Sequence, residues 1–278
     1  MSYDSYKNNS RQSRFTRSYG FQGRAENTDE AELGGRRNSH NERFGTSFNV
    51  AEVRSAFIRK VYAIVGIEMF IISVITAIFL FSPLRDIVYG NSSWRIIYLV
   101  LTFAFLILVM VLVCCPADKV IRNWPVNICL LTVIVIVMGF ILGIISAYYT
   151  VESIMIAAGL TTGTVLLVSL FAFFTRIDFT RCIGFLFILT IFLSLFGLAF
   201  MLVVWLADDY TIYVMKMIYG GLGALVILFS LVVDTQMMMI GKHKYTYSPE
   251  NYVFAALSLI LDIFNLFLYI LLIVGNER

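Results

Sequence analysis

Long apolar runs, separated by short polar connections, fill the chain from about residue 50 almost to its end. The runs do not alternate apolar and polar positions as strands would, and each approaches the roughly 20 residues that a helix needs to cross a bilayer. The pattern therefore predicts an all-α, polytopic membrane protein, built as a seven-transmembrane-helix bundle. The seven helices are expected at residues 61–81, 95–115, 126–148, 153–174, 182–206, 212–237 and 252–274.

The first 50 residues depart from this pattern. They are polar, rich in serine, asparagine, arginine and glycine, and contain few aliphatic side chains. Such a segment cannot bury enough apolar surface to offset the entropy lost on folding. The sequence thus predicts two parts, a disordered cytosolic tail at residues 1–50 and a transmembrane domain at residues 51–278.

Lysine and arginine are distributed unevenly between the two sets of connections, and this bias predicts the orientation in the membrane. The connections on one side, with the segment before the first run, hold Arg54, Arg59, Lys60, Lys119, Arg122, Arg176, Arg181, Lys242 and Lys244. The connections on the other side hold only Arg85, Arg95 and Lys216. The N-terminus is therefore expected in the cytosol, and seven spans then place the C-terminus on the far side.

The composition excludes several classes of function. Hydrophobic residues make up 59% of the 278 residues and charged residues only 14%, which is too apolar for a soluble domain. The net charge of +3 is too small to indicate a nucleic-acid partner. The four cysteines form neither a CxxC pair nor a zinc-like spacing with histidine, so we expect neither a disulfide framework nor a zinc site. No cofactor is expected.

One carboxylate interrupts each of the last two apolar runs. Asp234 lies seven residues before Gly241, about 10 Å along a helix, and Asp262 lies ten residues after Tyr252, about 15 Å. In an antiparallel hairpin the two lie at similar depth below the same membrane face, where they can meet. An ionisable residue is costly in hydrocarbon, so it faces the bundle interior and marks a functional site.

Two close carboxylates in a low-dielectric site cannot both ionise cheaply, so the pair is expected to share a proton and to titrate as a unit. Asp234 and Asp262 can then bind a hard cation such as calcium, for which they are the candidate ligands. They can also act as a pH-dependent latch or activate water for peptide hydrolysis. A fourth interpretation is structural, with each aspartate bonding only a neighbouring hydroxyl or backbone group.

Glu68 is a third carboxylate, in the first apolar run. It lies eight residues past Lys60, about 12 Å deep, which matches the depth of the two aspartates. If the first helix borders the last two, the three acids share one cavity. Otherwise Glu68 extends to the interface or bonds a single polar neighbour.

Two other functional classes lack their motifs. Presenilin-like proteases carry Tyr-Asp in one span and Gly-x-Gly-Asp in the next, whereas here Val233 precedes Asp234 and Leu261 precedes Asp262. Seven-helix receptors have the opposite orientation, and their Asp-Arg-Tyr and Asn-Pro-x-x-Tyr signatures are absent from the third and seventh runs. The chain is therefore expected not to be an enzyme, with an aspartyl protease kept only as a third alternative.

Four stretches of the sequence carry longer, more specific motifs. The last run contains SPENYVFAAL at residues 248–257 and FLYIL at residues 267–271, on either side of Asp262. The sixth contains DTQ at residues 234–236, the entry to the first contains FIRKVY at residues 57–62, and the fourth connection contains TRIDFT at residues 175–180. Together these stretches resemble the Bax-inhibitor-motif transmembrane family, lifeguard branch, over about residues 50–275.

The resemblance implies a seven-helix bundle of the endoplasmic reticulum or Golgi whose Asp234–Asp262 pair gates a pH-sensitive calcium leak and which suppresses apoptosis. Calcium is then the permeant ion, and apoptosis-regulating membrane proteins are candidate partners besides the lipid bilayer. In the family a basic residue at the cytosolic end of the second span can latch an aspartate, which makes Lys119 and Arg122 candidate accessory residues. Glu68 is a third accessory candidate on its depth alone, because the resemblance supplies no role for it. The main alternative is a non-conducting membrane scaffold that binds apoptosis regulators.

Overall fold

The computed structural model describes residues 26–91, 93–114, 125–203, 208–239, 247–248 and 251–277. Contacts divide the chain into two units, Met1–Glu52 and Val53–Arg278. In the first unit the described residues are helical, as the N-terminal part of α1 (Glu26–Phe81), where the sequence predicts a disordered tail. The helix extends this far because each added residue gains a backbone hydrogen bond and no proline interrupts residues 26–52. Residues 1–25 lie outside the described part.

The all-α prediction for the membrane domain is confirmed. After α1 come α3 (Ser93–Cys114), α5 (Val126–Ala147), α6 (Val151–Phe174), α7 (Ile183–Val203), α8 (Asp209–Met237) and α9 (Tyr252–Val274). Among the described residues, six helices are long and apolar enough to cross a membrane, and the second predicted span appears as a shorter apolar stretch, Ile96–Val109, within α3. Each of the seven predicted runs therefore corresponds to one helix.

Among the described residues, two short helices lie in the connections and were not predicted. Helix α2 (Leu84–Gly90) follows the turn after α1, and a 3₁₀ turn, η2 (Phe179–Cys182), precedes α7. The Asp178 side chain caps η2 by accepting from the Thr180 N–H at 3.2 Å. Segments this short carry no readable apolar periodicity, so the pattern that predicts the spans cannot detect them.

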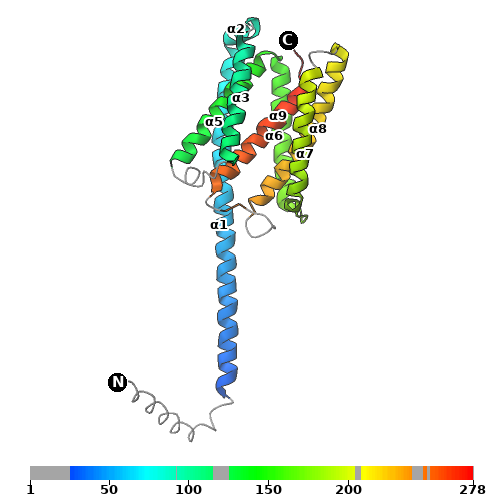
Figure 1. Cartoon of the computed structure of the whole chain (residues 1–278). Helices are drawn as coiled ribbons and strands as arrows, with labels where there is room; N and C mark the ends of the chain where they lie inside the picture. Colours follow the sequence, from blue (N-terminus) through cyan, green and yellow to red (C-terminus); the bar gives the residue numbers. More distant parts are fainter. Residues whose placement is uncertain are drawn as a thin grey trace, which may run out of the picture. The chain divides into compact units, whose positions relative to one another are not determined.

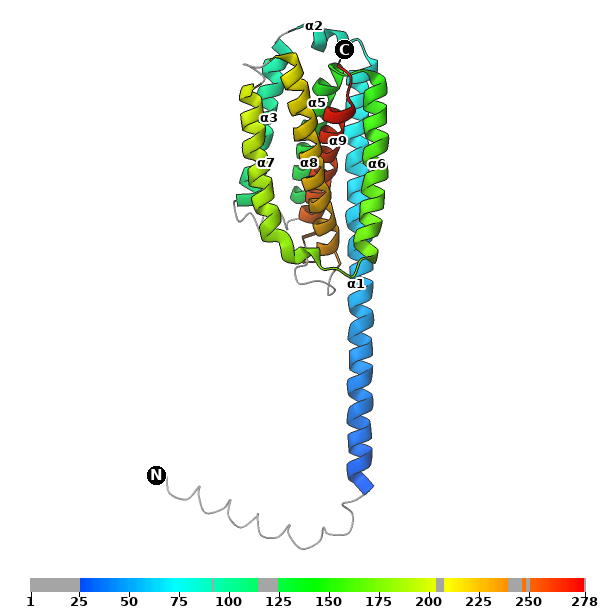
Figure 2. The same cartoon turned by 90° about the vertical axis from the view of Figure 1, so that its right-hand side faces the viewer.

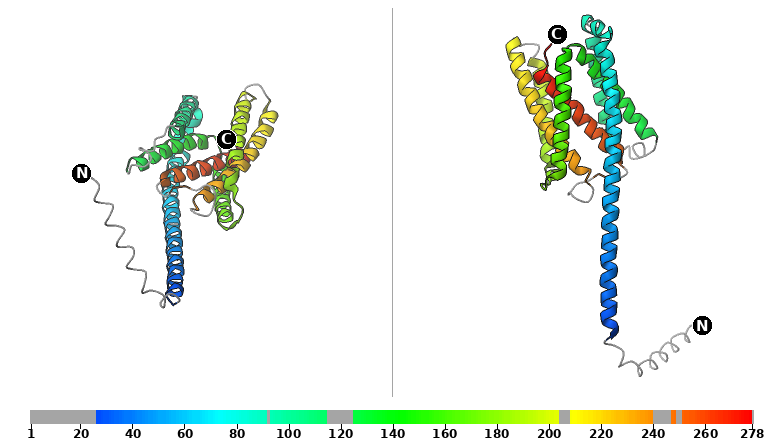
Figure 3. Two further views of the ribbon diagram at one scale, coloured as in Figure 1. Left: turned by 60° about the horizontal axis from the view of Figure 1, so that its bottom comes forward. Right: turned by 180° about the vertical axis from the view of Figure 1, so that it is seen from behind.

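Within the Val53–Arg278 unit, α9 runs obliquely through the middle of the bundle (Figures 1 and 2). Its most extensive contact is with α8, and it also packs against α6 and α5. Figure 3 shows from the opposite side that α6 and the membrane-domain part of α1 cover the other face of α9. The main core is formed by side chains of α1, α5, α6, α8 and α9. The last helix is therefore the element around which the others assemble.

Glycines let α5 approach α1 closely, because small residues four positions apart leave room for a neighbouring helix. A Cβ atom at Gly139 of α5 would lie 2.9 Å from Ile75 of α1, and one at Gly143 would lie 2.5 Å from Phe79. The same four-residue spacing in α6 marks no such approach, because a Cβ at Gly159 or Gly163 would have no neighbour within 4 Å among the described residues.

The C-terminal residues are fastened to the end of the bundle where α2 lies (Figure 1). The Thr150 N–H donates to Asn276 O at 3.0 Å, and the Asn276 N–H donates to Ser153 Oγ at 2.8 Å. Glu277 forms an ion pair with Lys216 of α8. Burial, followed by the negative charge of Glu277, raises the pKa of the neighbouring Tyr149 hydroxyl to about 12. The chain end thus joins the α5–α6 connection to α8.

Candidate functional site

Helices α8 and α9 bring the two predicted aspartates together. Asp234 lies in the last turn of α8, and Asp262 lies in the middle third of α9. The two carboxyl groups are close enough for a hydrogen bond between them. Asp262 is 6% exposed, and its Oδ2 has no hydrogen-bond partner among the described residues. The two carboxyl groups therefore form a close pair, and a hydrogen bond between them requires that one of the two carry a proton.

Hydroxyl groups surround the pair. The Tyr247 hydroxyl lies 3.3 Å from Asp234 Oδ1 and 3.3 Å from Ser258 Oγ, and Ser230 forms a side-chain hydrogen bond with Asp262. Ser230 lies one helical turn before Asp234, and Ser258 one turn before Asp262, so each helix presents a serine and an aspartate on the same face. A hydroxyl group can act as donor or acceptor, so these groups can reorient their hydrogen bonds when the charge of the pair changes.

Gln236 ties the same end of α8 to the connection between α6 and α7. Its Oε1 accepts from the Phe179 N–H and its Nε2 donates to Ile177 O, both at 2.8 Å. The side chain is fully buried. The DTQ motif thus places one residue in the carboxyl pair and, two positions later, one in a clamp on the neighbouring loop.

Glu68 is buried against α5 and apart from the pair. It is 3% exposed, and Thr132 Oγ1 donates to its Oε1 at 2.9 Å. Among the described residues no hydrogen bond joins Glu68 to Asp234 or Asp262, and no group of three histidine, cysteine, aspartate or glutamate side chains is placed to hold a metal. The structure therefore favours the interpretation in which Glu68 bonds one polar neighbour over a cavity shared by three acids.

The proposed basic latch residues, Lys119 and Arg122, lie outside the described residues, so their position relative to the pair stays a prediction. Among the described residues, no ion pair connects a basic side chain to either aspartate. Lys60 instead lies over the ring of Tyr252, 3.3 Å from its centroid, and the Tyr252 hydroxyl accepts from Asn127 Nδ2 at 3.3 Å. These contacts join α1, α5 and the start of α9.

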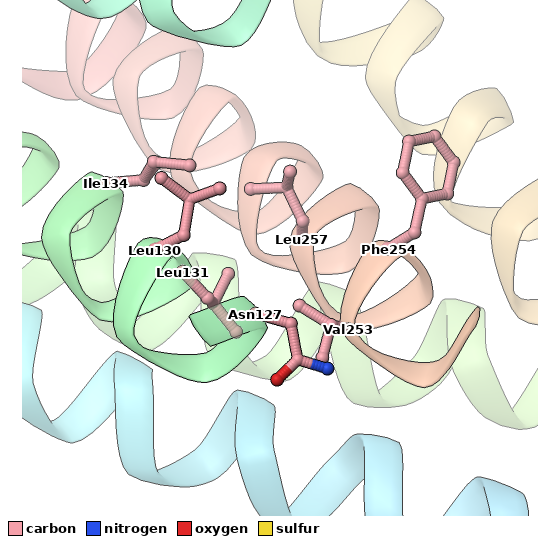
Figure 4. A pocket seen from close by; sticks show the side chains of 7 residues that line it. All are labelled: Asn127, Leu130, Leu131, Ile134, Val253, Phe254 and Leu257. Atoms are coloured by element: carbon pink, nitrogen blue, oxygen red, sulfur yellow. The ribbon is translucent and has the colours of Figure 1, made fainter. Parts of the chain in front are cut away.

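The described part of the chain holds two cavities against α9. The smaller, of about 20 Å³, separates α5 from the first turns of α9, and Asn127 is its one polar lining residue (Figure 4). It is large enough for one water molecule. The larger, of about 310 Å³, lies between α1, α5, α6 and α9. Its four hydroxyl-bearing side chains, Ser73, Thr76, Thr161 and Thr162, each donate to a carbonyl of their own helix, so its lining suits hydrocarbon better than an ion.

Comparison with known proteins places the chain in a family. A family model described as inhibitor of apoptosis-promoting Bax1 matches residues 54–278, which is the whole helical bundle. The chain belongs to the Bax inhibitor family. The resemblance that the motifs indicate, including the lifeguard branch, is confirmed. The match begins at the boundary of the second structural unit, so family membership concerns the membrane domain of this Bax inhibitor family protein.

Curated relatives cover most of this Bax inhibitor family chain. It is 35% identical to protein lifeguard 3 of Homo sapiens over 228 residues, which are 82% of the chain and 70% of that relative. Protein lifeguard 3 of Mus musculus is 36% identical over 227 residues, 81% of the chain and 71% of the relative. Bax inhibitor 1 of Schizosaccharomyces pombe is 30% identical over 224 residues, 80% of the chain and 77% of the relative.

Sequence reasoning missed the polar groups that surround the pair. Tyr247 lies outside the apolar runs, Ser230 and Ser258 are single hydroxyls within them, and Thr132 lies in a helix whose contact with α1 was not predicted. The serines could have been found from their spacing, because each stands four residues before an aspartate.

Proposed function

We propose that this protein is a pH-sensitive calcium leak channel of internal membranes, in the endoplasmic reticulum or Golgi, gated by Asp234 and Asp262. The observation that carries the proposal is the close approach of two carboxyl groups from adjacent helices, the half-buried Asp234 and the buried Asp262. Placing two such acids inside a membrane domain costs folding stability, which points to a functional role. Intramembrane acids recur in ion and proton pathways. The confirmed family supports a function in the control of cell death.

The gate follows from the charge of the pair. While the carboxyl groups share a proton, they hold α8 and α9 together. When the proton leaves, two like charges face each other in a site of low dielectric constant, and their repulsion favours separation of the helices. Separation also frees carboxylate oxygens, which are the ligands calcium prefers. Rising pH therefore opens the gate and falling pH closes it.

Suppression of apoptosis then follows from a lower resting calcium content of the store. The cytosolic N-terminus predicted from the lysine and arginine bias orients the α8–α9 connection, and hence the nearer end of the pair, toward the cytosol. The pH that the pair senses is accordingly that of the cytosol. Acidification of the cytosol is expected to reduce the leak.

The test is calcium efflux from proteoliposomes that contain the purified full-length protein, measured across a pH series. Wild-type efflux is expected to rise with pH. Asp234→Asn and Asp262→Asn are expected to stay at the low level at all pH values, because an amide imitates the protonated acid and cannot ionise. At the alkaline end the difference should be about tenfold, which 1.4 kcal/mol of gating free energy produces.

Glu68→Gln is the matched control for this experiment. It neutralises a carboxylate about as deeply buried as that of Asp262, but one whose described partner is Thr132 on α5. It is expected to keep the wild-type pH dependence. Efflux equal to that of empty liposomes at every pH, or efflux that falls with rising pH, contradicts the proposal.

A non-conducting scaffold that binds apoptosis regulators is the second candidate. The description of the matched family, inhibition of an apoptosis-promoting protein, favours it. Such a scaffold needs its partner, so it predicts no efflux from the purified protein alone. It also predicts that partner binding survives Asp234→Asn and Asp262→Asn, since Asp262 is buried and Asp234 half-buried between α8 and α9.

A further inference from the structure

The larger cavity, of about 310 Å³, is a crevice that opens on the side of the membrane domain. Helices α1 and α6 form its two sides (Figure 2), and Phe264 and Phe267 of α9 lie buried at its base. Two of its lining residues are largely exposed, Phe81 of α1 by 73% and Met155 of α6 by 63%. The crevice is therefore open sideways, toward the lipid that surrounds a membrane-spanning helix.

The crevice has about the length of one lipid leaflet. Its lining along α1 runs from Met69 to Phe81, twelve positions or about 18 Å of helix. Half of the hydrocarbon core of a bilayer is about 15 Å. Beyond Met69 the two sides meet, where the ring centroids of Tyr62 on α1 and Phe173 on α6 lie 6.4 Å apart. The crevice thus occupies the half of the domain nearer α2 and ends near the middle of the membrane.

The lining is suited to hydrocarbon. Its four hydroxyl groups, those of Ser73, Thr76, Thr161 and Thr162, each donate to the backbone carbonyl four residues earlier, so no hydroxyl hydrogen is left for a polar ligand. Apolar cavities of about 150 Å³ stay dry and bind benzene. An unfilled crevice of twice that volume would deprive its lining of dispersion contacts. A hydrocarbon chain from the surrounding bilayer restores those contacts.

A basic side chain lies at the end of the crevice nearer α2. Arg85 stands four positions after the lining residue Phe81, and its Nη2 donates at 2.7 Å to Tyr149 O, just before the start of α6. The Arg85 Nε is buried and has no hydrogen-bond partner among the described residues. A guanidinium group has five N–H donors and binds phosphate oxygens in pairs. Arg85 therefore offers positive charge at the level where a lipid headgroup lies.

We propose that the crevice binds one acyl chain of a phospholipid from the leaflet on the α2 side, and that Arg85 holds the phosphate of the same lipid. The lateral opening admits a chain from the bilayer, the length fits one leaflet, and the charge of Arg85 complements a phosphate. The inference goes beyond the calcium leak and is independent of it, because neither Asp234 nor Asp262 lines the crevice.

The first experiment uses liposomes that contain the purified full-length protein and a phosphatidylcholine with a photoreactive diazirine midway along one acyl chain. Crosslinked residues are mapped by mass spectrometry. The crevice lining of α1 and α6 is expected to be labelled about tenfold more than Phe185 and Phe192 of α7, which are 59% and 62% exposed. Equal labelling of the crevice and of α7 would mean that the chains only surround the protein, and it overturns the inference.

Ala158→Phe fills the crevice, because Ala158 is a lining residue of α6. It is expected to lower crevice labelling about tenfold, and with it the fraction of protein that retains one phospholipid in native mass spectrometry. Gly163→Phe is the control on the same helix. A Cβ at Gly163 would have no neighbour within 4 Å, so the added ring faces away from the crevice and should leave both signals unchanged.

Arg85→Gln tests the headgroup contact separately. It removes the positive charge and leaves the crevice open, so the retained phospholipid is expected to fall about tenfold, the effect of losing a hydrogen bond to a charged group. Arg181→Gln is the control, because Arg181 pairs with Asp178 in the connection at the other end of α6. Equal losses in the two variants overturn the role of Arg85.

The retained mass identifies the occupant. A phospholipid adduct that is lost in Ala158→Phe and kept in Gly163→Phe supports the inference. A free fatty acid as the adduct, or equal retention of phospholipid in wild type and Ala158→Phe, overturns it. The crosslinks of the wild-type protein decide the matter even if Ala158→Phe does not fold, since they depend on no substitution.

Discussion

Replacing Gln236 with leucine is expected to lower the free energy of unfolding by about 2–6 kcal/mol. Leucine is apolar and of similar volume, so the packing changes little. It leaves the Phe179 N–H and the Ile177 carbonyl, both partners of the Gln236 amide at 2.8 Å, without their bonds in a buried site. Each unsatisfied group costs about 1–3 kcal/mol. The measurement is unfolding of the purified protein in mixed micelles with increasing SDS.

Asn265→Leu is the matched control for this prediction. The Asn265 amide donates to Leu261 O at 2.9 Å, which is a carbonyl of its own helix. That carbonyl keeps the backbone hydrogen bond of α9 when the side chain is removed, so the loss should stay below about 1 kcal/mol. Equal effects of the two substitutions would show that the Gln236 clamp contributes no more than an ordinary intrahelical bond.

The Gln236 clamp shows which part of the site could be predicted from the sequence. The meeting of Asp234 and Asp262 follows from helix rise alone, because residues on two helices of a hairpin can be compared in depth by counting. Gln236 stands two positions from Asp234 and therefore faces a different direction around α8, toward a loop distant in sequence. Counting along one helix gives depth, but it does not say which neighbour lies at that depth.

Glu68 illustrates the same limit. Its depth matched that of the aspartates, yet it bonds Thr132 of α5, because α1 presents this residue to a helix other than α8 or α9. The glycines show it again, since the spacing in α5 marks a real contact with α1 and the same spacing in α6 marks none. Each span depends on its local sequence and was therefore predictable. The arrangement of the helices around α9 depends on contacts between different runs, so no single run predicts it.

Gly223→Leu is expected to destabilise the bundle by about 3 kcal/mol or more. A Cβ atom at Gly223 would overlap the ring of Tyr269 on α9. That ring has little room to retreat, because it packs edge-on against Tyr219, with 5.5 Å between centroids, and Tyr219 is itself held by Phe196 and Phe200 of α7. Overpacking of this kind forces side chains off their rotamers or separates the helices.

Gly221→Leu provides the control, two positions away on the same helix. A Cβ there would have no neighbour within 4 Å, and leucine favours a helix over glycine by roughly 0.5–1 kcal/mol, so this substitution should be neutral or slightly stabilising. The two variants therefore differ in sign, although they add the same side chain to the same helix. Tyr269→Ala in the Gly223→Leu background should recover part of the loss, because it opens the space that leucine needs. The measurement is an SDS unfolding series of the single and double variants. If Tyr269→Ala recovers none of the loss, the destabilisation does not arise at the contact between α8 and α9. That contact also aligns Asp234 with Asp262.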